Sequence, residues 1–322
     1  MHYVRRMRRV AGTIDLLTRD ERPWPSSGAL AARGQAFLAA CDPPGVRAVV
    51  DDPAPWRSPE ALWAALDGCT PLGRLAEYGR DPARNRLPDG RVQSQGEHTV
   101  ALVEGLHALR RGDLAWFSAR ASGPLGAAGT ALLAAVARWA RDAEEAVFRA
   151  TLLAGAFHDC GKLVGDVPGV DAENGVVLYD RLMADAGVGG PYATLGSVLV
   201  RFHDLVRHHA APGMLAFLTN AAAEASAGPG CAHALAAVQA AGRASIGVRR
   251  LGADTLEAMA DLVGRWPSPP PPPVRLTIVH TGCGTATLAH PFHTLVVDHV
   301  VTVDEPAGPV TLLNGTACGF AA

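Results

Sequence analysis

His158, Asp159 and Lys162 are neighbours in the sequence, and their types and spacing suit a small catalytic pocket that binds a cation. An imidazole and a carboxylate can bind one divalent cation together. Lys162 is the only lysine in the chain, because every other residue of the lysine and arginine class is an arginine. A lysine ammonium is a compact charge on a flexible stem, whereas a guanidinium is a wide planar fork. We therefore interpret Lys162 as a residue of a small catalytic pocket, where its ammonium can reach a phosphate or a metal-bound water.

His98 is a further candidate ligand, at the start of a predicted helix. The apolar residues Leu102, Leu106 and Leu109 follow it on one helical face, so the side chain of His98 points toward the core. A single inward histidine is more often a hydrogen-bonded core residue than a ligand. Because other candidate ligands accompany it, we interpret His98 as a member of the metal site.

More histidines lie near the end of a helix predicted over residues 192–209. At about 100° per residue, His209 falls near the centre of the apolar face and His208 near its edge. His203 lies further round, beside Asp204, and we interpret it as a surface residue. The alternative for His208 and His209 is a polar helix end whose cations favour the C-terminal dipole.

Apolar spacing predicts helices for most of the chain before residue 267 and strands after it. A helix predicted over residues 145–162 carries His158 and Asp159 toward its end, where Gly161 supplies the break. The predicted helices cover residues 28–40, 59–66, 98–111, 125–155, 192–209 and 254–266, and the predicted strands cover 276–279, 294–303 and 310–313.

A proline-rich run at residues 267–273 divides the chain, because such a run forms neither a helix nor a central strand. The fold class is therefore mainly α, with a small C-terminal β-rich module. We expect a helical N-terminal cap (residues 1–90), a helical metal-binding domain (91–266), the stiff linker, and the β-rich module (274–322).

The composition is that of a globular protein with a substantial core, since 48% of the 322 residues are hydrophobic and 19% are charged. A formal net charge of −2 gives no overall attraction to polyanions, so binding to nucleic acid would need a local basic patch. The six cysteines form no C-x-x-C pair, which argues against a disulfide framework and favours a reducing cytoplasm. No run of about 18 apolar residues predicts a membrane span.

The order His98, His158-Asp159, Lys162, His208-His209 resembles the HD superfamily of metal-dependent phosphohydrolases. The motif of that family is H…HD…D, often extended to HD-x-G-K. The likeness covers about residues 95–265, and F-H-D-C-G-K at 157–162 is its most specific part. It implies an HD-type helical bundle in which His98, His158 and Asp159 bind a divalent cation.

The resemblance also implies a last ligand and a substrate class. Asp261, in an A-D-L context, resembles the final motif of the family, and Asp254 is the alternative. Mn, Fe, Co, Ni, Zn and Mg are the expected metals, and mixed nitrogen and oxygen ligands disfavour Ca. Lys162 would neutralise charge on the phosphate. His208 and His209 would contact the substrate or a second metal.

The paired histidines, with Glu97-His98-Thr99, also look like the HD nuclease domain associated with CRISPR interference. A nucleotide or nucleic acid is therefore the expected substrate, and no phosphate-binding G-x-x-x-x-G-K-[ST] loop occurs. A nuclease would need a basic groove. The nearest candidates in the sequence are Arg80, Arg84, Arg86, Arg91, Arg201 and Arg207.

The C-terminal tail offers a rival metal site, but Pro291 breaks regular chelating geometry between its two spaced histidines. We interpret the tail instead as a module that docks a protein partner. The alternative to an enzyme is a non-catalytic helical scaffold with a degenerate HD pocket and a partner-binding tail. The rival ligands are Cys283, His290, His293, Asp298 and His299.

Overall fold

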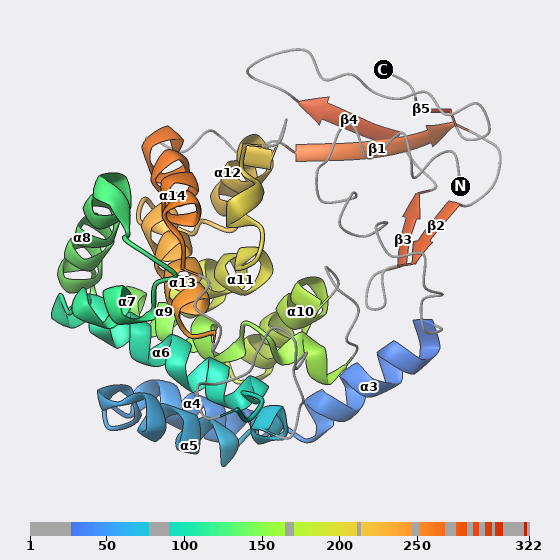
Figure 1. The fold of residues 1–322 in the computed structure, drawn as a ribbon. Coiled ribbons are helices and arrows are strands. Elements are labelled where there is room, and N and C mark those ends of the chain that lie inside the picture. Colours follow the sequence, from blue (N-terminus) through green and yellow to red (C-terminus); the bar gives the residue numbers. More distant parts are fainter. Residues whose placement is uncertain are drawn as a thin grey trace.

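The computed structural model describes residues 27–76, 90–164, 171–210, 214–246 and 251–267, together with the backbone of short C-terminal strands. The described residues before residue 268 are mainly α-helical, as the sequence predicts (Figure 1). Its helices are α3 (Ser27–Ala39), α4 (Pro43–Asp51), η1 (Pro55–Arg57), α5 (Pro59–Asp67), η2 (Pro71–Ala76), α6 (Gln95–Arg111), α7 (Ala115–Arg120), α8 (Gly126–Asp142), α9 (Glu145–Phe157), η3 (Cys160–Leu163), α10 (Asp171–Asp185), α11 (Pro191–Phe202), η4 (Val206–His208), α12 (Met214–Glu224), α13 (Cys231–Ala244) and α14 (Ala253–Arg265).

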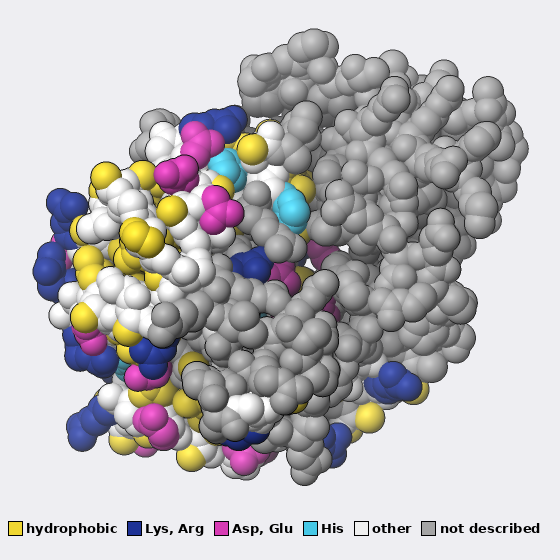
Figure 2. All heavy atoms as spheres, in the orientation of Figure 1, with side chains coloured by type: hydrophobic (Ala, Val, Ile, Leu, Met, Phe, Trp, Pro, Cys, Tyr) yellow, Lys and Arg dark blue, Asp and Glu magenta, His cyan; other side chains and the backbone are white. Residues whose placement is uncertain are grey.

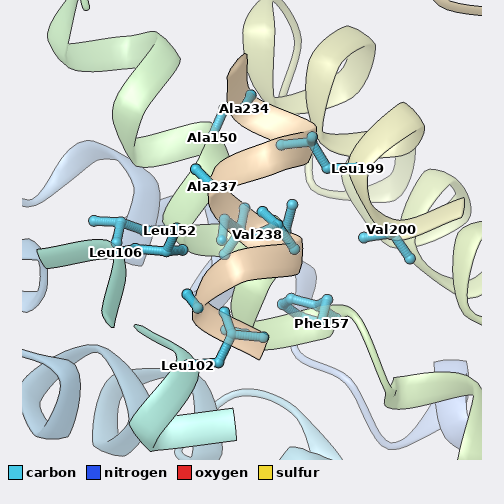
Figure 3. Close-up of a cluster of buried hydrophobic side chains, with 14 of the residues drawn as sticks. Leu102, Leu106, Ala150, Leu152, Phe157, Leu199, Val200, Ala234, Ala237 and Val238 are labelled. Carbon is cyan, nitrogen blue, oxygen red and sulfur yellow. The ribbon is translucent and has the colours of Figure 1, made fainter. Parts of the chain in front are cut away.

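Helix α13 runs through the core, and its many alanines let the neighbouring helices approach closely (Figure 3). Small side chains on a buried helix shorten the distance between helix axes, so the flanking leucines and phenylalanines fill the remaining space. The side chains around it are Leu102 and Leu106 from α6, Leu152 and Phe157 from α9, and Leu199 and Val200 from α11.

Two local features fix the segments that carry the predicted ligands. Ser94 caps the N-terminus of α6 and forms a capping box with Glu97, so the helix begins at Gln95, three residues before His98. Gly161 in η3 lies against the backbone of α10, where an added Cβ would stand 1.9 Å from the Asp171 carbonyl oxygen. Only glycine permits this approach, which holds η3 on α10.

Two of the predicted helices end earlier than their apolar spacing suggests. The helix predicted over residues 125–155 is divided into α8 and α9 at Ala143 and Glu144. The helix predicted over 192–209 ends at Phe202, and a turn then leads into η4. The ends of α9 and α11 therefore place histidines in turns rather than on helical faces.

The strands described in the C-terminal segment pair antiparallel. β1 pairs with β4 and β5, with Leu276 opposite Val303 and His280 opposite Phe320, and β2 pairs with β3. None of the helices described for this chain has the length and apolar content to cross a membrane. The proline run from residue 268 and the strand predicted at 310–313 lie outside the described residues. The strands are β1 (Arg275–Thr281), β2 (Ala286–Ala289), β3 (Thr294–Val297), β4 (Val300–Asp304) and β5 (Gly319–Phe320).

Candidate metal centre

His98, His158 and Asp159 each bring a ligand atom to one buried point, and these three atoms lie within 4.8 Å of one another. His98 comes from the first turns of α6, and the other two follow the end of α9. The two histidine Nε2 atoms are 3.2 Å apart. Asp159 Oδ2 lies 3.0 Å from His158 Nε2 and 3.9 Å from His98 Nε2. Two nitrogens and one oxygen in this arrangement could hold a metal ion.

Hydrogen bonds on the far side of each ring decide whether the nitrogen that faces this point carries a proton. His158 Nδ1 lies 2.7 Å from the Gly155 carbonyl, which can only accept, so Nδ1 carries the proton. His98 Nδ1 lies 2.8 Å from the Ser245 hydroxyl, which is itself 2.8 Å from the Gly242 carbonyl. The single Ser245 proton goes to that carbonyl, so His98 Nδ1 donates to the Ser245 oxygen. Both rings therefore present the lone pair of Nε2.

These lone pairs and the carboxylate make the buried point complementary to a cation. Two nitrogen lone pairs 3.2 Å apart repel each other, and a cation bound between them would remove this repulsion. Asp159 adds a negative charge beside them. The C-terminal end of α9, which precedes His158, contributes a partial negative charge of its own.

The two oxygens of Asp159 have different neighbours. Oδ2, on the histidine side, accepts a hydrogen bond from the side-chain amide of Gln95. Oδ1 accepts one from the ammonium of Lys162. Burial raises the pKa of Asp159, but His158 and Lys162 lower it by more, so this pKa lies well below its usual range. Asp159 is therefore a carboxylate, the form that binds a metal.

Lys162 lies beside the three ligands, held between two buried carboxylates. Its Nζ donates to Asp159 and lies 3.5 Å from Asp171 Oδ2. Burial lowers the pKa of Lys162, but the two carboxylates outweigh this effect and raise the pKa above its ordinary value. An ammonium has three donors, so one remains for another acceptor.

The prediction that His203 is a surface residue is wrong, because its side chain is buried beside the ligands. Its ring stands edge-on to that of His158, with the ring centroids 5.0 Å apart. Its Nε2 lies 3.7 Å from Asp159 Oδ1 and 3.6 Å from Asp204 Oδ2. Burial lowers the pKa of His203, but these carboxylates raise it to about 9. Since α11 ends at Phe202, the helical rotation does not apply at His203.

Asp261, the predicted last ligand, lies outside the three-residue group. Its carboxylate is 2.8 Å from His209 Nε2 and 3.0 Å from Arg265, and its side chain is 50% exposed. His209 points inward as expected, with Nδ1 3.0 Å from the Val206 carbonyl, but its other nitrogen meets Asp261. The alternative ligand, Asp254, is exposed and also lies outside the group.

The remaining candidates are only partly described. His208 is partly buried in η4. Arg91 pairs with Glu97 and Arg201 with Glu173, so acids accompany these two arginines of the predicted basic groove. On the face that Figure 2 draws, histidine side chains (cyan) lie near acidic (magenta) and hydrophobic (yellow) ones. Outside the described residues lie Arg80, Arg84, Arg86, the side chain of Arg207, Cys283, His290, His293, Asp298 and His299.

Sequence reasoning missed His203, Gln95 and Ser245 at this site, and also Asp171, which lies beside Lys162. His203 has a signal, because Phe202-His203-Asp204 repeats the triplet Phe157-His158-Asp159 at the end of another helix. Gln95 has a weaker signal, since it stands three residues before His98 and so shares its side of α6. Ser245 has none, because its contact with His98 depends on the packing of α13 against α6.

Comparisons with protein-family models, with curated proteins and with solved structures find no match for this chain.

Proposed function

We propose that the protein is a metal-dependent phosphohydrolase of the HD type that holds a divalent cation between His98, His158 and Asp159. The observation that supports this most strongly is the convergence of two imidazole lone pairs and one ionised carboxylate at a buried point. These donors suit Mn, Fe, Co, Ni or Zn better than Ca, and Mg stays among the candidates. A bound cation would polarise a phosphoryl oxygen and acidify a water molecule.

The neighbouring side chains hold the ligands and leave one donor for the substrate. Gln95 fixes the Asp159 oxygen that faces the histidines, and Lys162 fixes the other oxygen. The carboxylate is therefore held in one orientation before any metal binds. The third donor of Lys162 is the group that we assign to a phosphate oxygen, where it would offset developing negative charge.

The substrate class that we propose is a nucleotide or a nucleic acid, and a small nucleotide is the better first candidate. Arg91 and Arg201 are each paired with a glutamate, which weakens their attraction for a long polyanion. If nucleic acid is the substrate, KM should rise steeply with salt as counterions are released. A small nucleotide should give a KM that depends little on salt. We assign the C-terminal strands to contact with a protein partner.

The test is metal binding and turnover in the wild type and in Asp159→Asn, which keeps the shape of the side chain and removes its charge. After titration with Mn or Co, the wild type should hold metal, hydrolyse a generic phosphodiester or a nucleotide, and melt at a higher temperature. At a metal concentration of 100 times Kd, the stabilisation should be about 2.7 kcal/mol. Asp159→Asn should lose the metal, the turnover and the shift in melting temperature together.

Asp185→Asn is the matched control, because Asp185 is a partly exposed acid in α10 that pairs only with Arg181 among the described interactions. That variant should behave as the wild type in all three measurements. Stoichiometric metal in Asp159→Asn would contradict the proposed ligand set. Metal binding without turnover on a broad panel of phosphoesters would favour the non-catalytic scaffold.

A further inference from the structure

We infer that Ser245 is a positioning residue for this centre, because it holds the proton of His98 on Nδ1 and so leaves Nε2 as the ligand atom. The consequence for metal affinity rests on the proposed function. The assignment of the His98 proton does not, since it follows from contacts of the protein alone.

Ser245 is itself fixed by contacts on several sides. It follows the last residue of α13, its side chain is buried, and its hydroxyl is 2.8 Å from the Gly242 carbonyl. Its amide bonds to the Ala241 carbonyl. Its own carbonyl accepts a hydrogen bond of 2.7 Å from the Gln93 side chain, just before α6. A hydroxyl held in this way cannot turn freely to offer its proton to His98.

The direction of this hydroxyl matters because a neutral imidazole has two tautomers. If the proton moved to Nε2, the ring would present an N–H to the point where the metal is proposed to bind. His158 obtains the same control from a backbone carbonyl, Gly155, which no side-chain substitution can remove. The corresponding partner of His98 is a side chain. The tautomer of His98, unlike that of His158, can therefore be tested by mutation.

The experiment combines two measurements on Ser245→Ala. Long-range ¹⁵N–¹H NMR of the metal-free protein reports which His98 nitrogen carries the proton, and calorimetric titration with Mn or Co reports metal affinity. In the wild type we expect the Nδ1–H form. In Ser245→Ala we expect a shift toward Nε2–H and a Kd about 10- to 100-fold higher, the usual effect of losing a hydrogen-bond partner of a metal ligand. Ser245→Thr, which keeps the hydroxyl, should restore both.

Thr219→Val is the matched control for loss of a buried hydroxyl. Thr219 lies in α12, is buried, and donates to the Ala216 carbonyl three residues earlier at 3.0 Å, as Ser245 does to Gly242. It should change neither the His98 tautomer nor the metal affinity. An equal loss of affinity in this variant would show a general effect of destabilisation and would overturn the role given to Ser245.

The tautomer measurement tests the positioning role of Ser245, and the metal titration tests the proposed function. A wild-type His98 with its proton on Nε2 would overturn the inference even if Ser245→Ala fails to fold. An unchanged tautomer and an unchanged Kd in a folded Ser245→Ala protein would do the same. If the wild type shows Nδ1–H and Ser245→Ala shifts it, but neither protein binds metal, the positioning role stands and the proposed function fails.

Discussion

Lys162 shows how one side chain can serve both the structure of a site and its chemistry. Its ammonium joins Asp159, a proposed ligand, to Asp171, the first residue of α10. Both carboxylates are buried, so the lysine neutralises charge that would otherwise be costly to bury. Its third donor is the one that we assign to a phosphate. Arginine at this position therefore tests the reach of the donor, and methionine tests its charge.

Lys162→Arg should retain stoichiometric metal but lose about 1–3 kcal/mol of transition-state stabilisation, because a guanidinium keeps the charge and misplaces the donor. Steady-state kinetics with saturating Mn would measure this loss as a lower kcat. Lys162→Met, which removes the charge, should also lower the free energy of unfolding of the metal-free protein. A wild-type kcat in the arginine variant would show that the identity of this cation has no catalytic importance.

The same contact between a histidine ring and a backbone carbonyl recurs at three helix ends. His158, His203 and His209 each place Nδ1 on the carbonyl three residues earlier, at 2.7, 2.8 and 3.0 Å. At the ends of α9 and α11 the ring thereby satisfies a carbonyl near the helix end, where carbonyls lack intrahelical partners, whereas the Val206 carbonyl also accepts the backbone N–H of His209. The opposite nitrogen is then aimed away from the helix, and in each case a carboxylate lies within 4 Å of it.

The same helix ends explain which parts of the site the sequence could predict. The spacing of apolar residues predicts that His98 points inward, and this is confirmed because His98 lies within α6. His203 was assigned to the surface by extending the helical rotation past Phe202, where the helix has already ended. The contact between Ser245 and His98 joins residues 147 apart, so no local pattern could indicate it.

Gly161→Ala should disrupt the junction between η3 and α10. Its Cβ would lie 1.9 Å from the Asp171 carbonyl oxygen and 2.6 Å from the Gly175 nitrogen, and backbone atoms cannot move aside as a flexible side chain can. We expect a loss of about 3 kcal/mol in the free energy of unfolding, as for other overpacked sites, and weaker metal binding. Urea denaturation and metal titration would measure the two effects.

Gly264→Ala is the control for this substitution, because Gly264 lies in α14 with open space around its Cβ position. It should leave metal binding unchanged and raise helix stability by up to about 1 kcal/mol. If both alanine variants unfold at the same urea concentration, the close approach at Gly161 is not needed for the fold.

A half-buried imidazole outside the metal centre links the stability of the whole molecule to pH. The ring of His107 packs edge-on to Phe148 at 6.2 Å, and its Nε2 meets no hydrogen-bond partner among the described residues. Burial, with a smaller contribution from Arg111, lowers the pKa of His107 to about 4. The unfolded chain, with a pKa near 6.5, binds more protons between these values. Stability should therefore fall as the pH falls from 6.5 to 4. The charged groups that act on this ring are Arg110, Arg111, Glu60 and Glu145.

His107→Leu should reduce this acid-induced loss by about 1–2 kcal/mol, less than the full shift because the ring is only partly buried. Urea denaturation of the metal-free wild type and variant at several pH values between 6.5 and 4 would measure it. Subtracting the two curves of unfolding free energy against pH removes the contributions of the other titrating groups, which both proteins share. Parallel stability curves over this range would show that His107 does not sense pH.

The distance in sequence between His98 and Ser245 sets an order of events during synthesis. His98, His158 and Asp159 leave the ribosome well before residue 245 is made, and the contact that fixes the His98 proton spans 147 residues. A nascent chain that ends before α13 thus contains all three proposed ligands but lacks the hydroxyl that prepares one of them. Tight metal uptake should consequently come late in translation, and a bound ion would mark a chain whose core is already closed.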